Sequence, residues 1–145
     1  MNEQHLFRGK QKDNGEWVTG YYVFQRKRSG VFGQVISELD FDRHLIIDLR
    51  GNLHEVIPET VGQYTGLKDK NGKLIFEGDI IRTKKYGRVI AHSNVRDYDI
   101  FIITYVPAVF RLENIHRAFN LVGNSVDYEV IGNIHDNPEL LEVEK

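Results

Sequence analysis

Alternation with a period of two is the dominant hydrophobic pattern along this chain. The stretch GEWVTGYYVF is crowded with aromatic and β-branched residues, and HLIIDL and LHEVI share that character on either side of a short polar break. Such runs fit a pleated, half-buried sheet, whereas the apolar positions of a helix recur every three or four residues. The pattern predicts a mainly β protein, either all-β or β-rich α+β, built from antiparallel strands.

Glycine-containing turns separate the predicted strands. Asn14-Gly15 lies between LFRGKQK and EWVTGYYVF, and Asn71-Gly72 lies between a strand at 65–69 and a return strand at 73–76. Asn-Gly favours a two-residue type I′ turn, because both residues tolerate positive φ. We therefore assign structural roles in turns to Asn14, Gly15, Gly66, Asn71, Gly72, Gly78 and Asp79.

The second half of the chain continues the β pattern. Residues 80–83 predict a strand, 84–87 a basic turn and 88–91 an antiparallel return, while IFIITYV at 100–106 has the length and branching of a buried strand. Residues 111–122 fit either a helix or a strand. A short closing helix is expected at PELLEV, with Asn137 as its N-cap.

Pro58 is the best candidate for a boundary, because it cannot donate to a strand ladder. It divides an N-terminal antiparallel β subdomain, residues 1–57, from a C-terminal part, residues 58–145. In the second part a Gly-Asp strand start, a basic turn and Arg-Val-Ile follow one another, in a layout similar to SH3-like small barrels. The expected architecture is therefore a β subdomain followed by an SH3-like barrel and a short C-terminal helix.

Composition narrows the functional classes. The 145 residues are 41% hydrophobic and include no cysteine, so a core is expected and thiolate chemistry is excluded. The N-terminus lacks the apolar segment of a secretory signal and no apolar run is long enough to span a bilayer, so neither a secretory signal nor a membrane span is expected. The net charge of −2 argues against general attraction to nucleic acid. Basic residues nevertheless gather between Lys68 and Arg88, and acidic residues follow Asp127.

Familiar catalytic and ligand-binding motifs fail at decisive positions. His54-Glu55 begins like a zinc-protease helix, but Pro58 stands where the second histidine is required. Residues 66–74 resemble a phosphate or calcium loop, but Leu74 replaces an essential residue in each. Carboxylate pairs such as Glu77 and Asp79 are also expected in turns. We therefore predict no catalytic residue, metal site or cofactor, and no enzyme activity.

A basic and aromatic cluster is the strongest remaining chemical signal. Cations that contact phosphate and rings that stack on bases are typical of single-strand binding. The same pattern also arises in solvated basic turns and in edge strands that avoid unwanted pairing. The candidate residues for binding a nucleic acid or a protein partner are Arg82, Lys84, Lys85, Tyr86 and Arg88.

Three long motifs resemble the YopX family of phage and prophage proteins. They are FRGK with GEWV and Gly20 near the N-terminus, ETVGQYTGLKDKNG continuing through IFEGDII, and YEVIGNIHDNPELL near the end. The resemblance implies a phage or prophage protein in a bacterial cytoplasm, with a mainly β fold and an SH3-like C-terminal part. It implies no activity and no functional residue.

Two functional hypotheses follow. The first is a non-enzymatic protein-interaction module that binds a host or phage protein through exposed strand edges or the acidic tail. The second is nucleic-acid binding by the basic cluster at residues 82–88. Complementary basic and acidic regions also permit a homo-oligomer.

Overall fold

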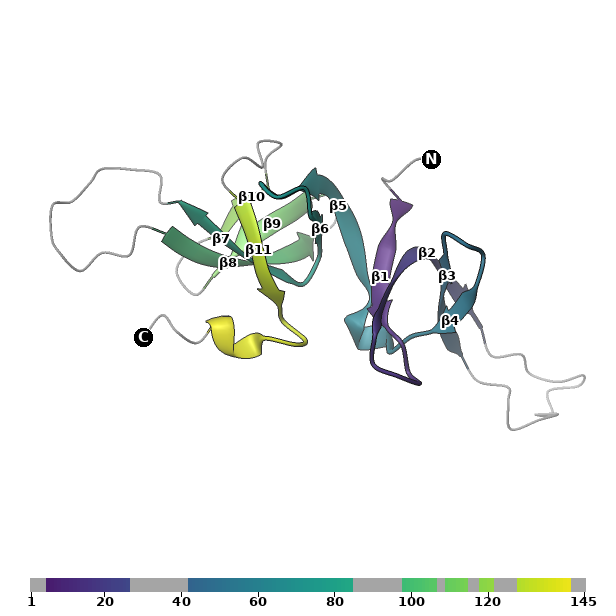
Figure 1. The fold of residues 1–145 in the computed structure, drawn as a ribbon. Coiled ribbons are helices and arrows are strands. Elements are labelled where there is room, and N and C mark those ends of the chain that lie inside the picture. Colours follow the sequence, from purple (N-terminus) through teal and green to yellow (C-terminus); the bar gives the residue numbers. More distant parts are fainter. Residues whose placement is uncertain are drawn as a thin grey trace, which may run out of the picture. The chain divides into compact units, whose positions relative to one another are not determined.

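The computed structural model describes residues 5–26, 42–84, 98–106, 109–114, 118–121 and 128–141. Antiparallel strands make up most of their regular structure, in two sheets with strand orders β4-β3-β2-β1-β5-β6 and β10-β9-β8-β7-β11 (Figure 1). The chain divides into two compact units, Met1–Gln63 and Tyr64–Lys145. The prediction of a mainly β fold is confirmed. The described part of the chain contains no helix long and apolar enough to cross a membrane.

Four antiparallel strands that follow one another along the chain form the first unit. Within it Ile46 and Val56 are completely buried, and an isolated bridge between Gln11 and Val56 joins the end of β1 to the residue after β4. Thr60 fixes the exit from this unit, because its hydroxyl accepts from the Lys10 N–H at 2.8 Å and donates to the Ile57 carbonyl at 2.6 Å. The elements are β1 (Phe7–Lys10), β2 (Trp17–Gln25), β3 (Arg43–Asp48), β4 (Leu53–Glu55) and the 3₁₀ helix η3 (Pro58–Thr60).

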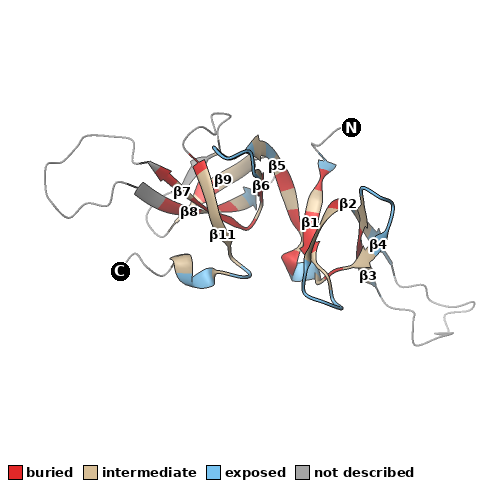
Figure 2. Cartoon of the chain, viewed as in Figure 1, coloured by how far each residue is buried: buried red, intermediate tan, exposed pale blue. Residues whose placement is uncertain are grey.

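The second unit contains the five-stranded sheet. Strand β5 (Gly62–Lys68) pairs with β1 through its first two residues and with β6 (Leu74–Phe76) through later ones. The remaining elements are β7 (Asp79–Lys84), β8 (Tyr98–Val106), β9 (Val109–Glu113), β10 (Ala118–Asn120), β11 (Tyr128–Asn133) and the 3₁₀ helix η4 (Pro138–Leu141). Figure 2 shows the buried residues in red along β7 and β8. The core comprises Ile75, Ile81, Phe101, Ile103, Leu112 and Tyr128.

The structure refines several predicted elements. Residues 111–113 and 118–120 are strand, not helix, because Leu112 pairs with Ile103 on one side and Phe119 on the other. The closing helix is a short 3₁₀ segment, and the Asn137 side chain accepts from the Asn133 N–H at 3.3 Å. The predicted return strand at 88–91 lies outside the described residues. Strand pairing among those residues leaves both sheets open, so the SH3-like barrel stays a prediction.

Both Asn-Gly turns are longer than the predicted type I′ turn. Asp69 N–H donates to the Lys73 carbonyl at 2.8 Å and Gly72 N–H to the Asp69 carbonyl at 3.0 Å, which defines a three-residue loop. Gly72 ends this loop with φ 81°, as in a type I turn followed by a glycine bulge. At Asn14, the Gly15 N–H reaches back to the Gln11 carbonyl at 3.0 Å, and the loop has four residues.

The Gly72 conformation leads to a stability prediction. Gly72→Val is expected to lower the free energy of unfolding by about 1–3 kcal/mol, because a β-branched residue is strained at positive φ. Urea unfolding measures this change, and Asn71→Ala in the same loop serves as the control. An unfolding midpoint for Gly72→Val equal to that of the parent protein would contradict the turn geometry.

Candidate functional site

The structure divides the predicted basic cluster. Arg82 lies on β7 directly opposite Glu129 on β11, and its guanidinium bonds to Glu129 Oε2, which also lies 3.4 Å from Lys70 Nζ. The Arg82 hydrogen bond is the main cause of the lowered pKa of the Glu129 carboxyl. The charge of Arg82 is therefore partly neutralised. Lys84 ends strand β7, whereas Lys85, Tyr86 and Arg88 lie outside the described residues.

The turn at residues 77–79 connects three strands of the second unit. Gly78 has φ 88°, its N–H donates to the Ile103 carbonyl, and its own carbonyl accepts from the Ile134 N–H, both at 2.8 Å. Asp79 is buried, and its Oδ2 accepts from the Phe76 N–H at 2.8 Å. Gly66 has φ 86° at an irregularity in the pairing of β5 with β6. The observed contacts of these residues are structural.

The buried carboxylate of Asp69 organises the β5–β6 turn. Its Oδ1 accepts from the N–H groups of Asn71 at 2.8 Å and Lys73 at 2.9 Å, and its Oδ2 accepts from the Val130 N–H at 3.0 Å. Burial alone would raise the pKa of Asp69, but these backbone donors together outweigh it, and the pKa is lowered. The turn thereby covers part of the edge of β11, since the Lys70 N–H also donates to the Tyr128 carbonyl at 2.9 Å.

A second turn with the same hydrogen bonds joins β3 to β4. Asp48 Oδ1 accepts from the N–H groups of Arg50 at 2.9 Å and Asn52 at 3.0 Å, and the Gly51 N–H donates to the Asp48 carbonyl. The sequence predicted a short turn at residues 50–52 but not the role of the Asp48 carboxylate in it. Its signal was an Asp three residues before a Gly, which DLRGN shares with DKNGK.

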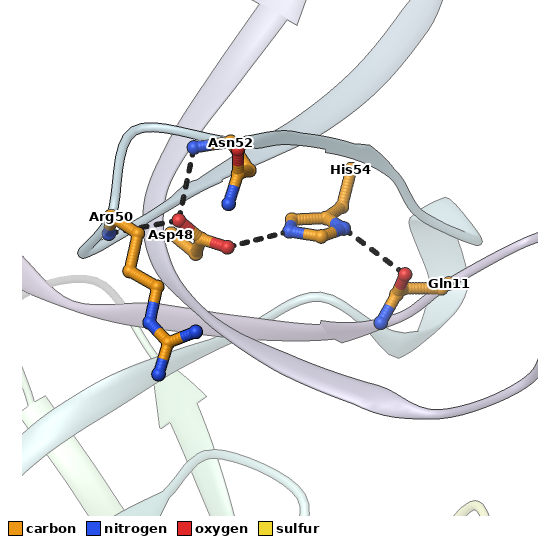
Figure 3. A network of polar contacts seen from close by, with 5 residues as sticks. All are labelled: Gln11, Asp48, Arg50, Asn52 and His54. Atoms are coloured by element: carbon orange, nitrogen blue, oxygen red, sulfur yellow. Dashed lines mark hydrogen bonds and ion pairs between the residues drawn. The ribbon is translucent and has the colours of Figure 1, made fainter.

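His54 joins the Asp48 turn to Gln11, the residue after β1, through the network in Figure 3. Its Nε2 lies 2.8 Å from Asp48 Oδ2, and its Nδ1 lies 3.1 Å from Gln11 Oε1. The His54 contact is the largest cause of the lowered pKa of Asp48. Both ring nitrogens of His54, which lies on β4, are therefore in contact with side-chain oxygens. Among the described residues, no group of three His, Asp or Glu side chains could hold a metal ion.

Exposed apolar side chains gather at the edge strand β4. Tyr21, Ile47 and Leu53 are direct neighbours across β2, β3 and β4, and so they share one face of the sheet. Tyr21 is 38% exposed and Leu53 63% exposed, and Leu49 in the adjoining turn is 56% exposed. We call these four residues the β4 edge surface.

Within the described part of the chain, the backbone of β4 is also open at Leu53. The Val56 N–H bonds to the His44 carbonyl and the Asp48 N–H to the Asn52 carbonyl, so even-numbered residues of this segment face β3. Odd-numbered residues must therefore direct their N–H and C=O groups away from β3. The Glu55 carbonyl accepts from the Lys12 N–H at 3.0 Å, whereas no described residue bonds to the outward N–H and C=O of Leu53.

An exposed aromatic residue also lies at the end of β8. Tyr105 is 46% exposed and its ring contacts Phe110 across the strand pair, with a centroid distance of 5.1 Å. The prediction of a buried strand holds for Ile100, Phe101 and Ile103 but is wrong for Tyr105. The exposure follows from its place near the end of β8.

Comparisons with known proteins extend over both units. A family model described as YopX protein matches residues 6–142. The search of curated proteins found no match. Among solved structures, the crystal structure of protein EF1440 from Enterococcus faecalis shares 27% sequence identity, covers 93% of this chain and 96% of its own, and superposes with a TM-score of 0.50.

Proposed function

The chain belongs to the YopX protein family, and on that premise we propose that it is a non-enzymatic protein-interaction module of a phage or prophage, working in a bacterial cytoplasm. The contacts of its central polar side chains support a structural role for them. Asp69 and Asp79 accept backbone N–H groups, and His54 is held between Asp48 and Gln11. The proposal therefore rests on the surface of the protein.

The β4 edge surface is the observation that carries this proposal. Soluble proteins expose single apolar side chains routinely, but adjacent ones at an open edge are typical of binding sites. Three of the exposed large hydrophobic side chains, Tyr21, Leu49 and Leu53, lie here. The open N–H and C=O of Leu53 suit an extended segment of a partner that adds to the sheet, with its apolar side chains on this face.

Site-specific crosslinking tests the proposal. A photoreactive amino acid at position 53, in bacteria that naturally carry the gene, is expected to trap a partner protein that the same label at exposed Glu139 does not trap. With that partner purified, Leu53→Asp is expected to weaken binding by about 10- to 100-fold, because a charge replaces a central apolar contact. Absence of a position-specific adduct would contradict an interaction at this surface.

A backbone substitution separates strand addition from other modes of docking. Leu53→Pro removes the N–H that points away from β3 and keeps an apolar side chain, and proline is tolerated at such edge positions. If the partner adds a strand, this variant binds as weakly as Leu53→Asp while its melting temperature stays near that of the parent protein. Unchanged binding would exclude strand addition at Leu53.

Nucleic-acid binding is the second candidate function. Lys70 in the β5–β6 turn and Arg82 on β7 share one carboxylate, Glu129, so these three side chains together keep a net positive charge. Fluorescence anisotropy with single- and double-stranded oligonucleotides at two salt concentrations tests it, since phosphate contacts weaken as salt rises. Absence of binding at low salt would exclude this function.

The strand order supports a finer proposal for the second unit. The last strand, β11, returns beside the first, β7, and β8, β9 and β10 follow on the other side. SH3-like small barrels share this order. We propose that residues 58–145 form such a barrel, preceded by a β subdomain at residues 1–57.

A further inference from the structure

The chain contains two Asn-Gly pairs, and the structure holds them differently. In such a pair the glycine nitrogen can attack the asparagine side chain with little steric hindrance, because glycine has no side chain. Each glycine N–H here donates to a turn carbonyl at 3.0 Å, Gly15 to Gln11 and Gly72 to Asp69. This hydrogen bond therefore does not distinguish the two pairs.

The asparagine side chains do distinguish them. Asn14 Oδ1 accepts from the Glu16 N–H at 2.9 Å, so this side chain is already engaged in its turn. At Asn71 the backbone N–H is held by Asp69 Oδ1 at 2.8 Å, whereas its side chain makes no hydrogen bond to any other described residue. The Asn71 carboxamide can thus rotate towards the Gly72 nitrogen without losing a partner.

The neighbouring charges favour the same site. Attack requires the glycine nitrogen to lose its proton and an oxyanion to form, and both species are stabilised by nearby cations. Lys70 and Lys73 flank Asn71-Gly72, although Lys70 is also paired with Glu129. Asp13 and Glu16 flank Asn14-Gly15 and oppose an anion there, where Lys12 is already bonded to Glu55. The Asp69 carboxylate lies beside Asn71, but three N–H donors already stabilise its charge.

We propose that Asn71 is a self-modifying site, at which the turn deamidates to aspartate and isoaspartate without an enzyme. The Gly72 nitrogen attacks Asn71 Cγ, a new N–C bond closes a five-membered succinimide, and the Cγ–N bond breaks. Ammonia leaves and carries away the proton released from the Gly72 nitrogen. One water molecule then opens the ring at either carbonyl, which gives aspartate or the isoaspartate linkage.

The modification would change the β5–β6 turn, which covers part of the edge of strand β11. Isoaspartate lengthens the main chain inside a loop whose ends are fixed by the Asp69 and Lys73 hydrogen bond, and it adds a negative charge near the Asp69 carboxylate. The turn is expected to loosen. The Val130 N–H, bonded to Asp69 Oδ2, and the Tyr128 carbonyl, bonded to the Lys70 N–H, then become accessible.

Ageing of the intact protein tests this proposal. The folded protein is incubated at pH 8 and 37 °C, and peptide mapping with enzymatic isoaspartate detection follows residues 14 and 71. A parallel incubation in guanidinium gives the deamidation rates of Asn14 and Asn71 in the unfolded protein. In the folded protein, Asn71 is expected to react at least about fivefold faster than Asn14, because charge and side-chain freedom both favour it. Comparable rates, or a faster Asn14, would overturn the assignment.

Hydrogen exchange tests the structural consequence separately. In the aged protein, exchange of the Val130 amide is expected to accelerate about tenfold or more, as its acceptor becomes mobile. Asn71→Gln, which cyclises much more slowly, is expected to retain the original Val130 exchange after the same incubation. If isoaspartate forms at residue 71 and exchange of the Val130 amide stays unchanged, the proposed loosening of the β5–β6 turn over β11 is wrong.

Discussion

Replacing Gly20 with alanine is expected to remove a large part of the stability of the first unit of this protein. Gly20 lies on β2 opposite Asp48, and a Cβ atom added to it would lie 1.9 Å from the Ile47 carbonyl oxygen. That neighbour is backbone, so β2 and β3 would have to separate. The expected loss is about 4 kcal/mol or more, at the upper end of overpacking effects. A unit of this size has a total stability of only about 3–9 kcal/mol.

Gly15 provides the matched control for this prediction. Its φ is 70°, but an added Cβ would meet no atom within 4 Å, so Gly15→Ala is expected to cost only about 1 kcal/mol of conformational strain. Urea unfolding, followed by the fluorescence of Trp17 in the first unit, compares the two variants. The close approach of β3 to Gly20 would be disproved if both substitutions shifted the midpoint equally.

Asp69→Ala is expected to have the second-largest effect, a loss of about 3–4 kcal/mol. Three backbone N–H groups, those of Asn71, Lys73 and Val130, would lose a charged acceptor. Hydrogen bonds to charged groups contribute about 1.5–3 kcal/mol each, and water would restore part of the loss in the opened turn. Denaturant unfolding at neutral pH measures the change. Lys68→Ala, at the end of β5, tests whether any side-chain truncation near the turn has this effect.

The pH dependence of unfolding identifies the carboxylate itself. The pKa of Asp69 is lowered by folding from 3.8, so its stabilising contribution is present above that value and is lost as the pH falls through the lower folded value. Asp69→Asn keeps one acceptor oxygen but cannot titrate. Between pH 5 and 2, the stability of Asp69→Asn should fall less steeply than that of the parent protein. Asp48, Glu55 and Glu129 also have lowered pKa values and contribute the remaining slope.

Strands and chain reversals could be predicted from the sequence because each depends on residues that are neighbours along the chain. Alternating apolar residues predicted strands, and the glycines at 15 and 72 indicated where the chain reverses. The prediction of a two-residue type I′ turn was wrong because it was based on the Asn-Gly pair alone. At residues 69–73 the decisive group is the preceding aspartate, whose carboxylate holds two N–H groups of a longer loop.

Features that depend on register could not be read in the same way. The β4 edge surface exists because Tyr21, Ile47 and Leu53 meet across three strands, and no sequence spacing reveals that alignment. The same holds for Arg82, whose carboxylate partner is 47 residues away. Residues 111–122 stayed ambiguous because their apolar spacing fits two periods, and pairing of Leu112 with Ile103 decides for the strand.

In the two aspartate turns of this protein, different oxygens of the same carboxylate form the turn and attach it to the rest of the fold. In DLRGN and DKNGK one carboxylate oxygen of the aspartate holds the turn, while the other contacts a group outside the turn, His54 in one case and the Val130 N–H in the other. The two five-residue turns should therefore be interchangeable, because the hydrogen bonds that form each turn lie within its own five residues. The two turns differ in the group that the second carboxylate oxygen contacts. Exchanging the two five-residue segments would therefore preserve the chain reversal at both places.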